Sequence, residues 1–159
     1  MAGGPKFAHA GAVLRRLARG VDGMRLVVCT NQSPVGQAVA EGVVAKRIAH
    51  ATTKLGQWLE DECGGLPVTV LVATAKDRFR KGVGTAMWDY LEALVRAEPG
   101  APAVDRAGSF FVGDADGRVE AARYGRGAPR VRDSDRRFAE AVGVPFFSEQ
   151  EFFTQKHPQ

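Results

Sequence analysis

The chain has 159 residues with a mass of 17.0 kDa, and 45% of the residues are hydrophobic. That size suits one globular domain with its own core, and the composition excludes collagenous and disordered chains. The 22 basic and 18 acidic residues give a net charge of +4 and a sequence pI near 9.4, which favours contact with polyanions. Two cysteines are too few for a disulfide framework, and no apolar run reaches the roughly 20 residues of a membrane-spanning helix. We therefore expect an intracellular protein that does not bind membranes.

Hydrophobic periodicity predicts helices that alternate with short apolar strands. The expected elements are, in order, a helix at 12–19, a strand at 24–30, a helix at 38–63, a strand at 67–73, a helix at 85–97, a strand at 109–113, a helix at 135–142 and a strand at 145–148. Such alternation is typical of an α/β fold in which helices cover a parallel sheet.

Large apolar side chains identify the expected core. The long second helix is predicted to bury one face, made of Val43, Val44, Ala45, Ile48, Leu55 and Leu59. Trp58 and Trp88 are interpreted as anchors in the core or against a partner, because each has leucine neighbours about one helical turn away. The Phe-Phe pairs at 146–147 and 152–153 are too dense to stay exposed, so they are expected to pack on the sheet edge or on a partner.

Polar residues stand at or beyond the carboxyl ends of three predicted strands. Thr30 and Asn31 close the first strand, Lys81 lies downstream of the second, and Asp114 follows the third. Ligands of open α/β sheets bind at this edge. A hydroxyl, an ammonium and a carboxylate that converge there would suit a phosphate and a divalent cation. We assign Thr30, Asn31 and Lys81 as vestigial phosphate ligands and Asp114 as a vestigial metal ligand, and we favour structural hydrogen bonding as the present role of these side chains.

Residues 118–137 form an arginine-rich stretch with only three acidic residues. Its arginines are Arg118, Arg123, Arg126, Arg130, Arg132, Arg136 and Arg137. Guanidinium groups bind phosphate oxygens through a planar fork of donors that an ammonium group lacks. This stretch is our candidate nucleic-acid surface, and the alternative is a solvated basic face without a partner.

The first 21 residues contain no acidic residue but carry Lys6, Arg15, Arg16 and Arg19. A mitochondrial presequence has this charge pattern, and so does a short amphipathic helix with apolar residues at 13, 14 and 17. We favour the helix. For the location of the protein we prefer the mitochondrion to the nucleus.

Several motifs, taken in their order along the chain, point to one family. They are Thr30-Asn31-Gln32, Arg80-Lys81 with Met87-Trp88, the run Phe111-Val112-Gly113-Asp114-Ala115-Asp116-Gly117-Arg118, and a tail with Ser134-Asp135-Arg136, Pro145-Phe146-Phe147 and Glu151-Phe152-Phe153. From about Phe7 to Phe153 the chain resembles the phosphatase domain of polynucleotide kinase 3′-phosphatases, within the haloacid dehalogenase superfamily. The resemblance implies a Rossmann-like three-layer domain at 11–153, with an N-terminal extension at 1–10 and a tail at 154–159.

The resemblance also implies a catalytic element that these residues do not show. In the family a strand ends in Asp-x-Asp-Gly-Thr, whose first aspartate attacks phosphorus and whose second acts as general acid and base. No such element precedes Thr30, and Asp114-Ala115-Asp116-Gly117 corresponds instead to the family's later metal-binding motif. Gly82 stands where the family usually has proline, which is expected to loosen the loop that places Lys81. Hydrolysis by this chain alone is therefore not expected.

The strand that carries the absent motif is the central one in the implied fold, between the strands at 24–30 and 109–113. Proteins do not leave such apolar strand edges open. Either residues 3–10 fold back into the slot or a partner chain inserts a strand there. We expect the partner, because residues 3–10 have little β-propensity.

These inferences predict a catalytically degenerate pseudoenzyme without a cofactor. Its expected role is structural, as an RNA-contacting subunit that binds other protein subunits in a large ribonucleoprotein such as an organellar ribosome. One alternative is half of a split, active 3′-phosphatase for DNA or RNA end repair, in which a partner supplies the Asp-x-Asp strand and Mg²⁺ binds Asp114. Another is an incomplete gene model of an ordinary repair phosphatase.

Overall fold

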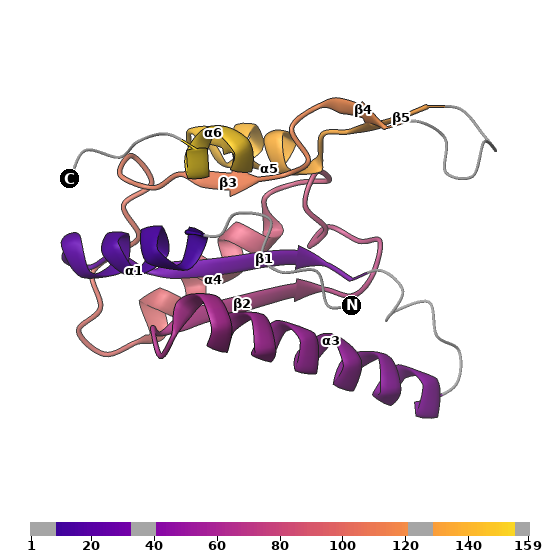
Figure 1. Cartoon of the computed structure of the whole chain (residues 1–159), viewed down its shortest axis with the longest axis horizontal. Helices are drawn as coiled ribbons and strands as arrows, with labels where there is room; N and C mark the ends of the chain where they lie inside the picture. Colours follow the sequence, from indigo (N-terminus) through magenta and orange to yellow (C-terminus); the bar gives the residue numbers. More distant parts are fainter. Residues whose placement is uncertain (1–8, 33–40, 121–128, 155–159) are drawn as a thin grey trace. The chain divides into compact units, whose positions relative to one another are not determined.

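The computed structural model describes residues 9–32, 41–120 and 129–154, and the chain divides into two compact units, residues 1–76 and 77–159. Each unit combines helices with a parallel pair of strands (Figure 1). The α/β class expected from the sequence is therefore confirmed. The three-layer haloacid dehalogenase arrangement and the division into 1–10, 11–153 and 154–159 stay predictions.

The first unit contains two described helices and one two-stranded sheet (Figure 1). Helix α1 spans Ala10–Gly20 and packs against helix α3, which spans Glu41–Cys63. Strand β1, Leu26–Asn31, pairs in parallel with strand β2, Val68–Ala73. Valine and leucine dominate both strands, as expected for strands buried between layers. The predicted helix at 12–19 and the predicted strands at 24–30 and 67–73 are thus confirmed.

Helix α3 is less covered by the rest of the described chain than its sequence predicts. Leu55 and Leu59 are half-buried, but Val43 and Ile48 are 43% and 48% exposed. Trp58 is 40% exposed and is therefore not a core residue. At about 1.5 Å per residue the 23 residues of α3 extend much further than the six-residue strands of this unit, at about 3.3 Å per residue. The prediction of one continuous buried face is therefore wrong for the first turns of the helix.

The second unit contains seven described elements. They are helix α4 (Ala86–Ala97), strand β3 (Phe111–Gly113), strand β4 (Arg118–Glu120), strand β5 (Arg130–Arg132), helix α5 (Ser134–Val142), strand β6 (Phe146–Ser148) and helix α6 (Glu149–Thr154). Strand β3 pairs in parallel with β6, and β4 pairs antiparallel with β5. The elements α4, β3, α5 and β6 are predicted from the sequence. Helix α6 and the β4–β5 pair are not predicted, because each of these two strands has only one apolar residue among charged ones.

Aromatic residues and one face of α4 form the core of the second unit. Trp88 is 7% exposed, which confirms its place in the core. The ring centroids of Phe111 on β3 and Phe138 on α5 are 5.3 Å apart, with the rings nearly perpendicular. Phe152 on α6 lies against both Phe110 and Phe147, at 5.4 and 6.1 Å. The expectation that the Phe-Phe pairs pack together near the sheet is therefore confirmed.

Each parallel sheet of the described residues has two strands. Residues 3–8, most of the segment considered as a substitute central strand, lie outside the described ranges, and Ala10 already belongs to α1. Insertion of a partner's strand stays a prediction. None of the described helices is both long and apolar enough to cross a membrane.

Candidate functional site

A buried ion pair links the loop after β2 to helix α5 in the second unit. Lys81 Nζ lies 2.7 Å from Asp135 Oδ1, and the two side chains are only 12% and 5% exposed. The second carboxylate oxygen of Asp135 accepts a hydrogen bond from Ala115 N at 3.2 Å. Within the described residues Asp135 Oδ1 has no partner that meets the geometry of a hydrogen bond. Its contact with Lys81 Nζ is therefore an ion pair in which the donor is not aligned with the oxygen. The pair places a charged lysine beside the segment that begins with Asp114.

The end of β3 and the start of α5 together position Asp135. The backbone N–H groups of Asp135 and Arg136 both donate to the carbonyl oxygen of Ala115 at 3.2 Å. Gly113 ends β3 directly beneath this turn, and a Cβ atom on it would lie 2.6 Å from Asp135 Cβ. Only glycine leaves room for the carboxylate at this position. Asp135 belongs to the tail motif of the sequence, but its pairing with Lys81 cannot be predicted from spacing, because the two residues are far apart in the chain.

Gly82 fixes the loop that carries Lys81. Its φ of +84° lies in the left-handed region, which proline cannot adopt because its ring holds φ near about −65°. A Cβ atom on Gly82 would stand 3.0 Å from Ser134 Cα, so the loop packs closely on the first turn of α5. The sequence predicts a loosened loop at this glycine. In the structure the close packing and the ion pair of Lys81 determine where the loop lies.

Asp114 directs its carboxylate to two arginines rather than into an open site. Its Oδ2 atom lies 3.2 Å from Arg118 Nη2 on β4 and 3.2 Å from Arg132 Nη2 on β5. The neighbouring Asp116 accepts a hydrogen bond at Oδ1 from Arg118 N at 3.1 Å. The antiparallel β4–β5 pair therefore brings two guanidinium groups to the carboxylate that the sequence analysis assigns to a metal.

This donor set does not suit Mg²⁺, which prefers several oxygen ligands in octahedral geometry. Asp114 already balances two positive charges, and Asp135 balances Lys81. Within the described ranges no three His, Cys, Asp or Glu side chains gather closely enough to hold a metal ion. The residues therefore do not fit the metal that the family resemblance implies, and we derive no chemical step through one.

The predicted phosphate ligands at the end of β1 belong to the first unit. Thr30 Oγ1 accepts a hydrogen bond from Gln32 Nε2 at 3.0 Å, and Gln32 N donates to the carbonyl oxygen of Ala73 at 2.7 Å. Thr30 and Asn31 are both half-buried. These bonds tie the polar tripeptide to the end of β2. The convergence of Thr30 and Asn31 with Lys81 stays a prediction.

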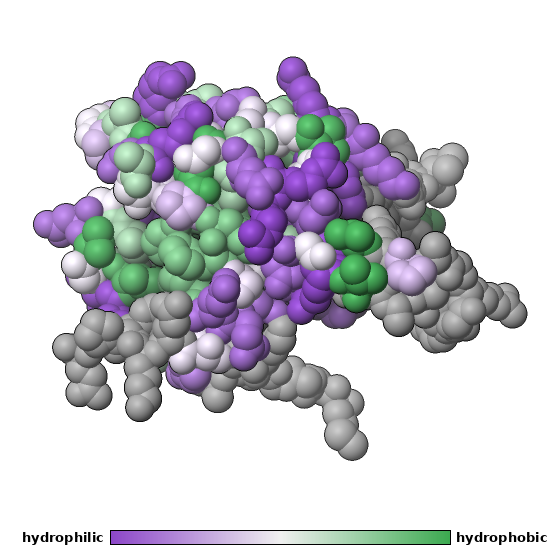
Figure 2. Space-filling model, turned by 90° about the horizontal axis from the view of Figure 1, so that it is seen from above, coloured by the Kyte–Doolittle hydropathy of each residue, from purple (hydrophilic) through white to green (hydrophobic). Residues whose placement is uncertain are grey.

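The arginine-rich stretch is only partly described, and its arginines differ in role. Arg118 and Arg132 contact Asp114, whereas Arg136 and Arg137 are exposed on α5. Arg136 donates from Nε to the carbonyl oxygen of Asp116 at 2.7 Å, and its guanidinium lies 5.0 Å from the centroid of the Phe146 ring. Arg130 lies on β5, and Arg123 and Arg126 fall outside the described ranges. Figure 2 shows that hydrophilic residues cover much of the face it displays.

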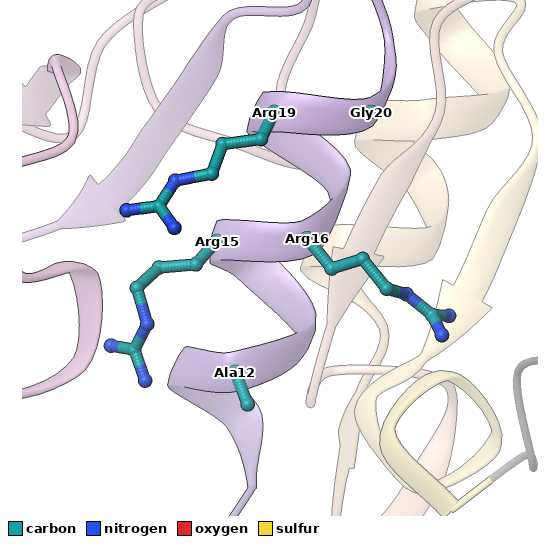
Figure 3. A pocket seen from close by; sticks show the side chains of 5 residues that line it. All are labelled: Ala12, Arg15, Arg16, Arg19 and Gly20. Carbon is teal, nitrogen blue, oxygen red and sulfur yellow. The ribbon is translucent and has the colours of Figure 1, made fainter. Parts of the chain in front are cut away.

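Two shallow hollows lie on the described surface, and one of them has a basic lining. One of about 360 Å³ lies between the Lys81 loop and α5 and is lined by Gly82, Val83, Gly84, Arg137, Glu140 and Ala141. The other, of about 480 Å³, lies along α1 and is lined by Ala12, Arg15, Arg16, Arg19 and Gly20. Figure 3 shows Arg15 and Arg19 extending on one side of the helix and Arg16 on another. Residues 10–20 thus form the helix that the sequence predicts, and its arginines line this hollow.

Two glutamates have lowered pKa values. A hydrogen bond from Arg106, at 2.6 Å, is the main cause of the lowered pKa of Glu92, and a hydrogen bond from Trp88 Nε1 at 2.6 Å adds to it. Arg106 also donates to the carbonyl oxygen of Val142 at 3.3 Å, which connects α4 to the end of α5. Hydrogen bonds from the backbone and then the hydroxyl of Ser148 lower the pKa of Glu151. Both carboxylates hold elements of the second unit together.

Comparisons with known proteins agree with the motifs. A family model described as polynucleotide kinase 3 phosphatase matches residues 7–153. An uncharacterized 20.8 kDa protein in the FGF-VUBI intergenic region of Autographa californica nuclear polyhedrosis virus is 28% identical over 130 residues. The matched region covers 82% of this chain and 62% of the viral protein, so the chain spans less than two thirds of that relative's length.

Proposed function

The chain belongs to the polynucleotide kinase 3 phosphatase family, and we propose that residues 1–159 bind polynucleotides without hydrolysing their terminal phosphates. One observation carries this proposal. Asp114, the acidic residue that directly follows β3, lies 3.2 Å from both Arg118 and Arg132. Two guanidinium groups on one carboxylate reduce its power as a nucleophile and compete with any cation for its oxygens.

Asp135 and Asp116 also use their carboxylates in contacts within the protein. Asp135 is buried and holds Lys81 and Ala115 N, and Asp116 accepts from the backbone of Arg118. A covalent mechanism needs a carboxylate that can reach phosphorus. Loss of a covalent nucleophile costs on the order of 10⁶ in rate in a well-studied protease. Residues 1–159 therefore have the charge to bind a phosphate and little means to attack it.

Binding to nucleic acid is supported by exposed positive charge. Arg136 and Arg137 are both exposed on α5, and the whole chain has a net charge of +4. Val119 and Val131 are paired across β4 and β5 and are 64% and 54% exposed. Contiguous exposed apolar surface rimmed by polar residues is typical of interaction sites. We assign to the protein the role of a structural, RNA-contacting subunit in a larger ribonucleoprotein, in which partner chains cover such surfaces.

A second candidate function is half of a split 3′-phosphatase. The observation that favours it is the ion pair between Lys81 and Asp135, whose charged atoms are 2.7 Å apart. Asp135 also accepts from Ala115 N, so the pair lies next to the segment that begins with Asp114. In that case a partner chain would supply the attacking aspartate and the metal ligands. Adding such a partner to residues 1–159 would then produce phosphate release that neither chain shows alone.

Two measurements on the same protein test the first proposal. Fluorescence anisotropy with a single-stranded RNA that carries a 3′-phosphate should show binding that weakens with salt, because phosphate contacts release counterions. Release of inorganic phosphate, in buffer with Mg²⁺, should stay at the level of a blank. The double variant Arg136→Ala with Arg137→Ala should bind more weakly and lower the salt slope by about 1 for each phosphate that an arginine no longer neutralises.

Arg96→Ala is the matched control, since Arg96 is also exposed but lies on α4. It removes a charge of the same kind and should leave the salt slope unchanged. Magnesium-dependent phosphate release that disappears in Asp114→Asn would overturn the proposal. Failure of the wild-type protein to bind RNA at low salt would overturn it as well.

A further inference from the structure

Two aromatic rings stand together on the surface of the second unit. The ring centroids of Phe79 and Tyr90 are 6.4 Å apart and the rings are nearly perpendicular, with an interplanar angle of 89°. Tyr90 is 51% exposed, and Leu94, one helical turn further along α4, is 37% exposed. A perpendicular pair of this kind holds each ring in a defined orientation. Phe79 is half-buried, so Tyr90 offers the more exposed of the two rings to a ligand.

Local structure holds both rings in place before any ligand binds. Tyr90 lies in the interior of α4, which spans Ala86–Ala97. Phe79 lies in a tight turn in which Phe79 N donates to Asp77 Oδ1 and Arg80 N donates to the carbonyl oxygen of Asp77, both at 3.0 Å. Preformed rings lose little conformational freedom on binding, which favours affinity.

Basic residues flank Phe79 in the sequence. The guanidinium of Arg78 lies 5.1 Å from the centroid of the Phe79 ring. Residues 77–81 contain the basic residues Arg78, Arg80 and Lys81, of which Lys81 is paired with Asp135, and one acidic residue, Asp77, whose carboxylate caps the turn. Asp89, the neighbour of Tyr90, accepts a hydrogen bond from Thr85 Oγ1 at 3.0 Å. The same short segment ends at Lys81 of the candidate phosphate site, so Phe79 precedes this lysine in the sequence and Tyr90 follows it.

We propose that Phe79 and Tyr90 form a stacking platform for an unpaired base of a single-stranded polynucleotide whose phosphates contact the neighbouring cations. This inference rests on the proposed function and adds base stacking to it. Aromatic side chains that alternate with basic residues are the usual means of holding single strands, because every base presents a flat face. Arg78 stacked on Phe79 extends the platform with a cation. An apolar protein partner would not require Arg78 and Arg80 beside the Phe79 ring.

The test compares two oligonucleotides of equal length and charge, one normal and one with abasic sites. Anisotropy is measured for the wild type, Tyr90→Ala, Tyr90→Phe and the control Trp58→Ala, an aromatic residue that is 40% exposed on α3. Stacking of one base predicts that Tyr90→Ala weakens binding of the normal strand by about 5-fold to 150-fold. The variant should bind both strands equally, and its salt slope should match that of the wild type, because the substitution removes no positive charge. Tyr90→Phe and Trp58→Ala should behave like the wild type.

The outcomes separate the platform from the proposed function. Wild-type binding that is equal for normal and abasic strands overturns the platform and leaves polynucleotide binding intact. Wild-type protein that binds neither strand at low salt overturns both. If Tyr90→Ala does not fold, the wild-type preference for the normal strand and its retention in Tyr90→Phe still decide the question. A Tyr90→Ala variant that folds and binds the normal strand as tightly as the wild type also refutes the platform.

Discussion

Replacement of Asp135 by asparagine removes the negative charge of the buried ion pair and keeps the shape of the side chain. At 2.7 Å and an effective dielectric constant of about 20, the attraction between Lys81 and Asp135 is about 6 kcal/mol. Desolvation of the two charges offsets much of this attraction in the wild type. Loss of one partner instead leaves a lysine that is 12% exposed without its counter-charge, which costs about 3–5 kcal/mol.

Asparagine cannot restore both contacts of the carboxylate. The wild-type Asp135 uses Oδ1 toward Lys81 Nζ and accepts from Ala115 N at Oδ2. The single amide oxygen of asparagine can serve only one of these donors, and its NH₂ group then faces the other. We therefore expect Asp135→Asn to lower the free energy of unfolding of the second unit by about 3–5 kcal/mol, a large share of the about 5–15 kcal/mol typical of a domain.

Urea unfolding followed by tryptophan fluorescence measures this change. A Trp58→Phe background leaves Trp88, which is buried in the core of the second unit, as the reporter. Lys81→Met should also destabilise the protein, and the double variant should recover part of the loss, because neither unpaired charge remains. An Asp135→Asn variant within about 0.5 kcal/mol of the wild type, or strictly additive single variants, would refute the reasoning.

Two further predictions concern the Lys81 loop and the contact of Arg106. Gly82→Ala should cost about 1–3 kcal/mol, because φ is +84° and the new Cβ would lie 3.0 Å from Ser134 Cα. The control Gly56→Ala in α3, where a Cβ meets no atom within 4 Å, should instead stabilise by about 0.5–1 kcal/mol, and urea melts that rank the two variants equally would contradict this. The lowered pKa of folded Glu92 means that its stabilising contribution is present above the unfolded value of 4.5 and is lost as pH falls through the folded pKa. Glu92→Gln should therefore reduce stability at pH 6 by no more than about 1 kcal/mol and by less at pH 3, as measured by unfolding at each pH. An equal loss at both pH values would show that the charge is not responsible.

Local patterns in the sequence were sufficient to predict most elements. The helix at 85–97 has an apolar face and ends at Pro99-Gly100, and the structure places α4 at Ala86–Ala97. The valine-rich run at 67–73 likewise matches β2, Val68–Ala73. These features follow from propensity and from the periodicity of side chains along one segment. The family could also be inferred from the order of its motifs, since order is a property of the sequence.

Tertiary structure alone decided which charges meet. The sequence suggested a vestigial metal ligand in Asp114, and the β4–β5 pair places Arg118 and Arg132 on its carboxylate. It did not single out Asp135, whose pairing with Lys81 joins segments that are far apart in the chain. Arginine-rich strands carry no clear alternation of apolar residues, so the pattern that would have predicted β4 and β5 was absent. Whether a carboxylate attacks, binds a cation or holds a neighbour depends on burial and on partners from distant segments, and only the folded chain brings these together.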